Sequence, residues 1–380
     1  MSGSIDSSRS KKYKKSSKLG DDLEDDIPEF LSKYEKVYGR VKDYVLFEEI
    51  GRGTQGTVYK CLNLVNKRVY AIKSLENSSL SRRKSRFGSS LNSLKNEINI
   101  MKALNHKNLV KLYDVIDEPK SDKLHLVMDY IQGGNVMGDQ KVMLNPGSDI
   151  ALSEDTARNL FGQFVLAIEY LHQQGVLHRD IKPSNMLIDN NTDDGLPLLK
   201  VCDFGVSSMC NFEKSAKLLG EDDVIYGGVC GTVAMMSPEA LGAGPDNYYH
   251  GRPADVWAAG VTLFCMLFGC LPFKASNFEE AKKSILEANV VFPSKPRVSQ
   301  EAKNLILQML QKNPHTRVTM SLVREDLWFN GAFCKDPDDA YREPTEVASE
   351  GSGLGKIIRR TRSRGSRTSS FLSWFRCGRR

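Results

Sequence analysis

The chain has 380 residues, 53 Lys or Arg against 47 Asp or Glu, a formal net charge of +6 and 40% hydrophobic residues. These proportions are typical of a globular protein with a sizeable core. No apolar run reaches the ~20 residues that cross a bilayer, so we expect no membrane span. The eight cysteines include no C-x-x-C pair, which argues against a zinc site or a disulfide framework.

Residues 1–40 are rich in Ser and Lys and then acidic. Low apolar content predicts that this segment is a disordered tail, suited to regulation or docking. Its first six residues lack the apolar core of a signal peptide. We therefore expect the protein in the cytoplasm, with the membrane periphery or the nucleus as alternatives.

A glycine-rich run, G-x-G-x-x-G-x-V, covers residues 51–58 between an apolar stretch and an alternating one. This pattern predicts a hairpin rather than a strand-to-helix turn, and so favours a phosphate-covering loop over a dinucleotide fold. Glycine suits such a loop because a backbone without side chains can close over phosphate oxygens. Taken alone the run is weak evidence, and the alternative is an ordinary glycine-rich turn.

Residues 69–73 form a short β-prone run that ends in Lys73. An insert at 76–92, rich in Ser, Arg and Lys, separates it from a predicted amphipathic helix at 93–104. One face of that helix is apolar and is made by Leu94, Ile98, Met101 and Leu104. Glu97 lies where it could pair with Lys73.

The second half of the chain reads as mostly helical. A helix start is predicted at Ser153, and apolar residues follow at helical spacing. Residues 199–202 form an apolar strand that ends at Asp203, and residues 256–271 are apolar nearly all round, which indicates a buried central helix.

The run His-Arg-Asp-Ile-Lys-Pro-Ser-Asn at 178–185, followed by Asp-Phe-Gly at 203–205, is the most informative feature of the chain. Transfer of the terminal phosphoryl group of ATP needs positioning and cations. Asp180 would accept or orient the hydroxyl proton of the acceptor, and Lys182 would lie beside the phosphate. Asn185 and Asp203 supply the oxygen ligands that Mg²⁺ prefers.

With these elements in this order over residues 44–329, about three quarters of the chain, the sequence resembles a eukaryotic protein kinase. The resemblance implies an α+β bilobal protein kinase fold, with a β-rich N-lobe and a helical C-lobe. We expect the catalytic domain at 41–330, with the N-lobe at 41–130 and the C-lobe at 131–330. A linker and a basic, aromatic tail follow at 331–380.

Several shorter motifs narrow the resemblance. Ile-Lys-Pro-Ser-Asn at 181–185, Asp-Phe-Gly-Val-Ser at 203–207 and the run at 254–263 resemble the calmodulin-dependent protein kinase kinases. These enzymes and their relatives activate other kinases, including the AMP-activated type. The resemblance implies a serine/threonine kinase that phosphorylates activation-loop threonines of such kinases. A pseudokinase scaffold, or a kinase of other substrates localised by its tail, is the alternative.

The resemblance also assigns roles to individual residues. Thr232 would bridge Asp180 and Lys182, the two catalytic residues of the 178–185 run, while Asn185 and Asp203 would hold Mg²⁺. ATP would contact a larger set, with Met128 at the back of the pocket: Ile50, Gly51, Gly53, Gly56, Val58, Ala71, Lys73, Glu97, Met128, Asp129, Ile131 and Leu187.

Two structural roles follow in the same way. Asp255 would anchor the backbone near His178, and Glu239 would form a buried ion pair with Arg317.

Kinases that select arginine before the target residue carry acids at two places, which here hold Asn135 and Ser184. We therefore expect a protein substrate that is another kinase, without strong selection for upstream arginine.

The C-terminal residues 356–380 contain nine Lys or Arg and no Asp or Glu, so the rest of the chain is net negative. Aromatic residues among these arginines suit an anionic membrane surface, and Cys377 could carry a palmitoyl chain. Ile358 and Phe371 are spaced like two anchors for calmodulin. A solvated basic tail is the third interpretation. We expect a monomer that recognises no specific nucleic acid.

Overall fold

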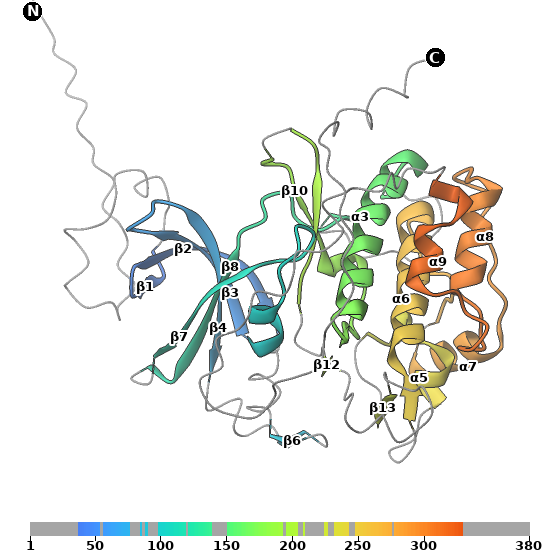
Figure 1. Cartoon of the computed structure of the whole chain (residues 1–380), viewed down its shortest axis with the longest axis horizontal. Coiled ribbons are helices and arrows are strands. Elements are labelled where there is room, and N and C mark those ends of the chain that lie inside the picture. Colours follow the sequence, from blue (N-terminus) through green and yellow to red (C-terminus); the bar gives the residue numbers. More distant parts are fainter. Residues whose placement is uncertain are drawn as a thin grey trace, which may run out of the picture.

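The computed structural model has a β-rich part joined to a helical part (Figure 1). It describes residues 37–53, 56–76, 84–85, 88–89, 98–118, 121–138, 150–192, 195–203, 208–209, 224–226, 232–242, 248–275 and 277–329. This is the α+β bilobal architecture that the resemblance implied.

Six antiparallel strands form the N-lobe sheet in the order β1-β2-β3-β4-β8-β7. They are β1 Gly39–Val41, β2 Tyr44–Gly53, β3 Gly56–Asn63, β4 Val69–Glu76, β7 Leu112–Glu118 and β8 Lys123–Asp129. Successive side chains of a strand face opposite sides. On β4, Tyr70 and Ile72 pack in a small cluster with Val127, whereas Leu75 joins the main core. The face that carries Leu75 and Lys73 therefore turns toward the rest of the molecule.

The C-lobe is built around two long helices. Its helices are α3 Glu154–Gln173, α5 Pro238–Gly242, α6 Gly251–Phe268, α7 Phe278–Glu287, α8 Gln300–Met309 and α9 Met320–Arg324. The hydroxyl of Ser153 accepts a hydrogen bond from the Thr156 N–H and caps α3, which confirms the predicted start. From Asp255 to Phe268 every residue of α6 is buried, as the sequence predicted for a central helix.

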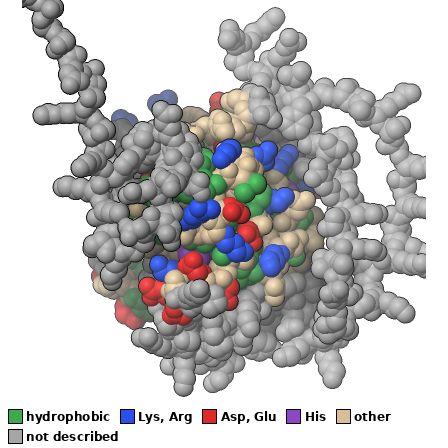
Figure 2. Space-filling model, turned by 90° about the vertical axis from the view of Figure 1, so that its left-hand side faces the viewer, with side chains coloured by type: hydrophobic (Ala, Val, Ile, Leu, Met, Phe, Trp, Pro, Cys, Tyr) green, Lys and Arg blue, Asp and Glu red, His purple; other side chains and the backbone are tan. Residues whose placement is uncertain are grey.

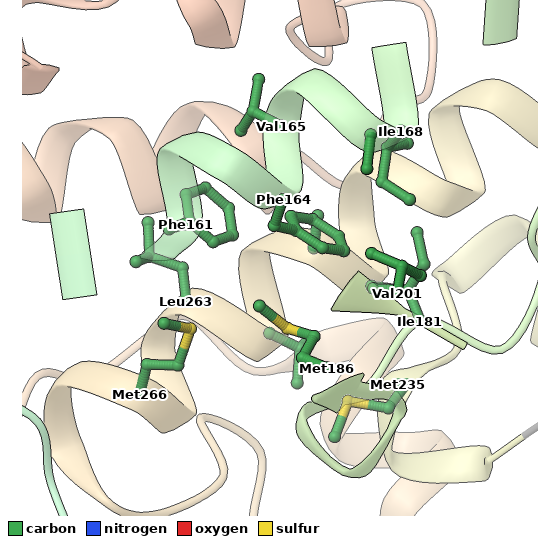
Figure 3. Close-up of a cluster of buried hydrophobic side chains, with 14 of the residues drawn as sticks. Phe161, Phe164, Val165, Ile168, Ile181, Met186, Val201, Met235, Leu263 and Met266 are labelled. Atoms are coloured by element: carbon green, nitrogen blue, oxygen red, sulfur yellow. The ribbon is translucent and has the colours of Figure 1, made fainter. Parts of the chain in front are cut away.

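The core of the C-lobe supports the segments that carry the polar motifs. Figure 3 shows Phe161 of α3 beside Leu263 of α6, while Ile168 of α3 lies toward Ile181 and Val201. The same cluster contains Ile181 and Met186 from the 178–185 run and its neighbour, Val201 from the strand before Asp203, and Met235. Close packing of these buried side chains therefore holds the segments that carry the polar motifs in place.

Short paired strands complete the fold. They are β5 Lys84–Ser85 with β6 Gly88–Ser89, β9 Val176–Leu177 with β12 Ser208–Met209, β10 Met186–Asp189 with β11 Leu198–Val201, and β13 Val224–Tyr226 with β14 Tyr248–His250. Within the described part of the chain, 3-10 turns include η4 Pro183–Asn185, η5 Val233–Met235 and η6 Leu327–Phe329. The β5–β6 pair is the described part of the insert predicted at 76–92.

Residues 98–103 are helical, and Ile98, Met101 and Leu104 are buried, as predicted for that part of the helix at 93–104. The rest of the helix predicted at 93–104, residues 1–36 and 330–380, and most of the segment from 204 to 231 lie outside the described residues. Residues 39 and 40, which the sequence assigned to the disordered tail, belong instead to β1, because they pair with β2. No helix within the described ranges is long and apolar enough to cross a membrane. On the face at the sheet end, acidic and basic side chains are interspersed with apolar ones (Figure 2).

Candidate active site

Asp180, Lys182 and Thr232 form a closed triangle of polar contacts. The Lys182 ammonium (Nζ) donates to Asp180 Oδ2 at 2.6 Å and to Thr232 Oγ1 at 3.2 Å. The Thr232 hydroxyl donates to Asp180 Oδ1 at 3.1 Å. Thr232 lies 52 positions after Asp180 in the chain, so the fold brings together the bridge that the resemblance implied. Both carboxylate oxygens of Asp180 are thereby held in place.

Asn185 follows in η4 and is bound to the same carboxylate. Its amide nitrogen donates to the Asp180 backbone oxygen at 2.9 Å and to Asp180 Oδ2 at 3.3 Å. Because the amide nitrogen is used in this way, the amide oxygen remains as the acceptor of the side chain. An oxygen acceptor there suits the metal role predicted for Asn185.

A buried carboxylate on α6 fixes the backbone before Asp180. Asp255 accepts from the backbone N–H of His178 at 3.0 Å and of Arg179 at 2.9 Å, as predicted. Arg179 has φ 66°, a left-handed conformation that non-glycine residues rarely adopt. The two hydrogen bonds hold the chain in this unfavourable conformation, which turns Asp180 toward its partners.

His172 in the last turn of α3 supports Asp255, a contact that the sequence did not indicate. Its Nε2 lies 2.9 Å from Asp255 Oδ2. Burial alone would raise the pKa of Asp255, but the hydrogen bond with His172, nearby charges and the Arg179 N–H together lower it. Asp255 is therefore ionised at neutral pH despite its burial.

Asp203 is delivered by β11 next to the 178–185 segment. The Cys202 N–H donates to the Asn185 backbone oxygen at 3.0 Å, and His178 Nε2 lies 3.2 Å from the Cys202 oxygen. Asp203 itself has φ 65°, and its Oδ1 lies 3.6 Å from Lys73 Nζ of the N-lobe. The predicted partner of Lys73, Glu97, lies outside the described residues.

Burial raises the pKa of the Cys202 thiol to about 12. Because the thiolate is the reactive form, this shift makes Cys202 a weak nucleophile and fits a packing role.

The glycine-rich run is a hairpin, as predicted. Gly53 pairs with Gly56, and Gly51 pairs with Val58, across β2 and β3. Gly56 has φ 156°, and a Cβ there would lie 2.2 Å from the Ser74 backbone oxygen. Only glycine fits this close approach of β3 to β4 without displacement of the backbone.

Four of the predicted nucleotide contacts lie on one face of the N-lobe sheet. Val58 pairs with Lys73, and Ala71 pairs with Met128, so these four side chains share a face. Ile50 stands at the edge of that set and is partly exposed. Ile131 follows Met128 in the segment between the lobes.

That segment is tied to the C-lobe through β10. The Gly133 N–H donates to the Ile188 oxygen at 3.0 Å, the Val136 N–H donates to the Met186 oxygen at 2.8 Å, and Asn135 forms a bridge with Leu187. Leu187, which the resemblance assigns to the nucleotide site, therefore lies beside the end of this segment.

Asp129 differs from its predicted role in one respect. It pairs with Tyr70, so its side chain lies on the opposite face of the sheet from Ala71 and Met128. Its N–H donates to the Lys111 oxygen at 3.1 Å, and its carboxylate is also bound on that far face. Only the main-chain carbonyl of Asp129 is left to face a nucleotide.

The site fits ATP with a divalent ion. Lys73 and Lys182 supply positive charge, the glycine hairpin supplies a close backbone, and Asn185 and Asp203 supply oxygen ligands. Within the described ranges, no group of three His, Cys, Asp or Glu side chains could hold a metal ion unaided. A divalent ion here would complete its shell with phosphate oxygens and water.

Outside the site, Glu239 and Arg317 form the predicted ion pair. Arg317 Nη1 and Nη2 donate to the two carboxylate oxygens of Glu239 at 2.6 and 2.9 Å. This pair ties α5, and with it the Thr232 segment, to the loop after α8.

Comparison with known proteins agrees with this geometry. Residues 44–329 match the family model of the protein kinase domain. A calcium/calmodulin-dependent protein kinase kinase of Caenorhabditis elegans is 34% identical over 308 residues, 77% of this chain and 53% of that protein. The serine/threonine-protein kinase ssp1 of Schizosaccharomyces pombe is 34% identical over 352 residues, 86% of this chain and 51% of that protein.

CBL-interacting protein kinase 32 of Oryza sativa subsp. japonica is 35% identical over 310 residues, 82% of this chain and 64% of the relative. The chain thus spans about half to two thirds of the length of these relatives. The matched residues include the whole polar site and both lobes. This chain belongs to the protein kinase family.

Proposed function

We propose that this protein is a Mg·ATP-dependent serine/threonine kinase that phosphorylates the activation-loop threonine of downstream kinases. The observation that supports it most is the triangle of Asp180, Lys182 and Thr232 beside Asn185 and Asp203. These five residues come from three segments that are distant in the sequence, and the fold brings their polar groups together.

Each residue has a defined task in this proposal. ATP bound with Mg²⁺ supplies the phosphoryl group, and Asn185 and Asp203 would hold the ion. Asp180 orients the acceptor hydroxyl and takes up its proton. Lys182, 2.6 Å from Asp180, places positive charge beside the developing negative charge. Thr232 keeps the Asp180 carboxylate from rotating.

We infer the substrate class from two positions that are acidic in kinases that select arginine before the target residue. Neither position is acidic in this protein. Asn135 uses its side-chain oxygen to accept the Met137 N–H at 3.1 Å, and Ser184 is exposed and uncharged. Neither can pair with a guanidinium group as a carboxylate does. Resemblance to kinases that act on other kinases, one of which is named a kinase kinase, supports a folded kinase as substrate.

The direct test is incubation of the purified protein with Mg·ATP and the unphosphorylated catalytic subunit of an AMP-activated-type kinase. Mass spectrometry should locate the new phosphate on the activation-loop threonine, and the Asp180→Asn variant should leave it unmodified. Phosphate at other sites only, or a peptide array dominated by upstream arginine, would contradict the substrate proposal but not the kinase activity.

A pseudokinase scaffold is the competing function. It would bind partners equally well with Asn at position 180, whereas the kinase proposal requires that this change abolish phosphate transfer.

For localisation, we propose that the basic tail at 356–380, which lies outside the described residues, attaches the protein to anionic membranes. In liposome flotation, a Phe371→Ala/Trp374→Ala variant should lose binding. Equal flotation of both proteins would refute this, and binding to calmodulin instead would support the alternative anchor interpretation.

A further inference from the structure

The Asp129 carboxylate joins three segments at the end of the N-lobe sheet. Its Oδ2 accepts from the Lys111 N–H at 3.0 Å, and its Oδ1 accepts from the Tyr113 hydroxyl at 2.8 Å. Lys200 Nζ lies 3.1 Å from Oδ2 and pairs with it as an ion. The side chains of Asp129 and Lys200 are 15% and 14% exposed. Salt therefore screens this contact less than it screens a surface pair.

The partners belong to different lobes. Asp129 ends β8, Lys111 and Tyr113 lie beside or in β7, and Lys200 lies in β11 of the C-lobe. Strand β11 ends at Val201 and leads directly to Asp203. At about 3.3 Å per residue, Lys200 is roughly 10 Å of chain from Asp203. A restraint on Lys200 is thus a restraint on the residue that is predicted to hold the metal.

Backbone hydrogen bonds next to this ion pair also restrain the position of β11. The Val110 N–H donates to the Val201 oxygen at 2.9 Å, and the Val201 N–H donates to the Asn108 oxygen at 2.8 Å. The Asn108 side chain, fully buried, donates to the Leu199 oxygen at 2.8 Å. These contacts set the position of β11 along the 108–111 segment, and the Asp129–Lys200 ion pair adds a link from β11 to the end of β8.

The ion pair cannot touch the nucleotide itself. Strand register places Asp129 on the face of the sheet opposite to Ala71, Lys73 and Met128. The contact of the Tyr70 and Tyr113 rings, with centroids 5.1 Å apart, lies on that same far face. Any influence on the reaction must therefore be exerted through the position of β11 relative to the sheet.

We propose that the Asp129–Lys200 ion pair, with Tyr113, is a clamp that positions Asp203 against the N-lobe and so sets the affinity for ATP. The clamp is formed in a structure in which Lys73 and Asp203 face each other across the lobes at 3.6 Å. Without the clamp, the lobes can adopt arrangements in which Lys73 and Asp203 are not aligned. The apparent affinity for ATP then falls in proportion to the fraction of molecules in which these two residues are aligned. Saturating ATP restores the aligned arrangement and with it the maximal rate.

Loss of Lys200 should not unfold the protein, because Asp129 keeps two donors, the Lys111 N–H and the Tyr113 hydroxyl. Burial and the hydrogen bond to Asp129 raise the pKa of Tyr113, so this hydroxyl remains a donor at neutral pH. Lys200→Met keeps most of the length of the side chain and removes the ammonium group with its charge and hydrogen bonds. Lys200→Arg keeps the charge, and Lys123→Met removes an exposed lysine from β8 as a matched control.

The test measures ATP binding by calorimetry in the presence of Mg²⁺, together with Tm, KM for ATP and kcat. Lys200→Met should weaken binding and raise KM about threefold to tenfold, with kcat within about twofold of wild type. Lys200→Arg should restore most of the affinity, and Lys123→Met should have no effect.

Unchanged ATP affinity in Lys200→Met, or a lowered Tm without a change in affinity, would overturn the proposal. So would equal defects in Lys200→Met and Lys200→Arg. The binding measurement needs no phosphate transfer, so the clamp proposal can fail or succeed independently of the proposed substrate.

Discussion

The Glu239–Arg317 ion pair yields the sharpest prediction for stability. Arg317 is 5% exposed, and besides Glu239 it donates to the Pro253 oxygen at 2.6 Å and the Gln311 oxygen at 2.9 Å. Arg317→Met leaves a largely buried carboxylate and the carbonyl oxygens of Pro253, Gln311 and Lys312 without this donor. Loss of one member of a buried ion pair costs about 3 to 5 kcal/mol, so the free energy of unfolding should fall by that amount.

Arg324 offers a matched control, since it pairs with Glu169 at 3.1 Å but its side chain is 30% exposed. Arg324→Met should cost at most about 1 kcal/mol. Urea unfolding followed by tryptophan fluorescence measures both, and Trp257, 5.2 Å from the Arg317 guanidinium, reports the local change. Equal losses in the two variants would refute the claim that burial makes the Glu239–Arg317 pair important.

Three further predictions concern the site and its support. Thr232→Ala frees one oxygen of Asp180 and should lower kcat about tenfold to a hundredfold in a phosphotransfer assay, whereas Thr232→Ser should stay near wild type. Gly56→Ala forces a Cβ against the Ser74 oxygen and should cost about 1 to 3 kcal/mol in thermal unfolding; Gly51→Ala, whose nearest contact would be 3.9 Å away, should not. The pKa of Asp255 is lowered in the fold, so its contribution to stability is present at neutral pH and is lost as the pH falls below about 4; Asp255→Asn should flatten the acid limb of the stability profile, and an unchanged limb would contradict this.

Much of the fold could be predicted because local patterns determine it. The hydroxyl at Ser153 caps α3, the apolar run after Asp255 produces a buried helix, and the glycine spacing at 51–56 produces a hairpin. Each of these depends on residues close in sequence. Thr232 is different, because it lies 52 positions from Asp180, and only resemblance to a known family could assign its role.

The contacts that the sequence did not indicate join distant segments through side chains of common types. A histidine near the end of a helix, such as His172, is ordinarily read as a favourable charge for the helix terminus, and nothing local shows that it binds Asp255. Likewise the contacts of Asp129 depend on which face of β8 it occupies. Strand register decides that face, and a shift by one residue would reverse it.

We claim above all that Asp180 is the catalytic base of an ATP site, and that it works only together with the other polar residues of that site. The most direct measurement is transfer of radiolabel from the terminal phosphate of ATP to a kinase substrate by wild type and by Asp180→Asn, with ATP binding measured on both proteins. We predict that the variant binds ATP nearly as wild type does and transfers label at least about a hundredfold more slowly. Equal transfer by the two proteins, or no transfer by a wild type that binds ATP, would contradict it.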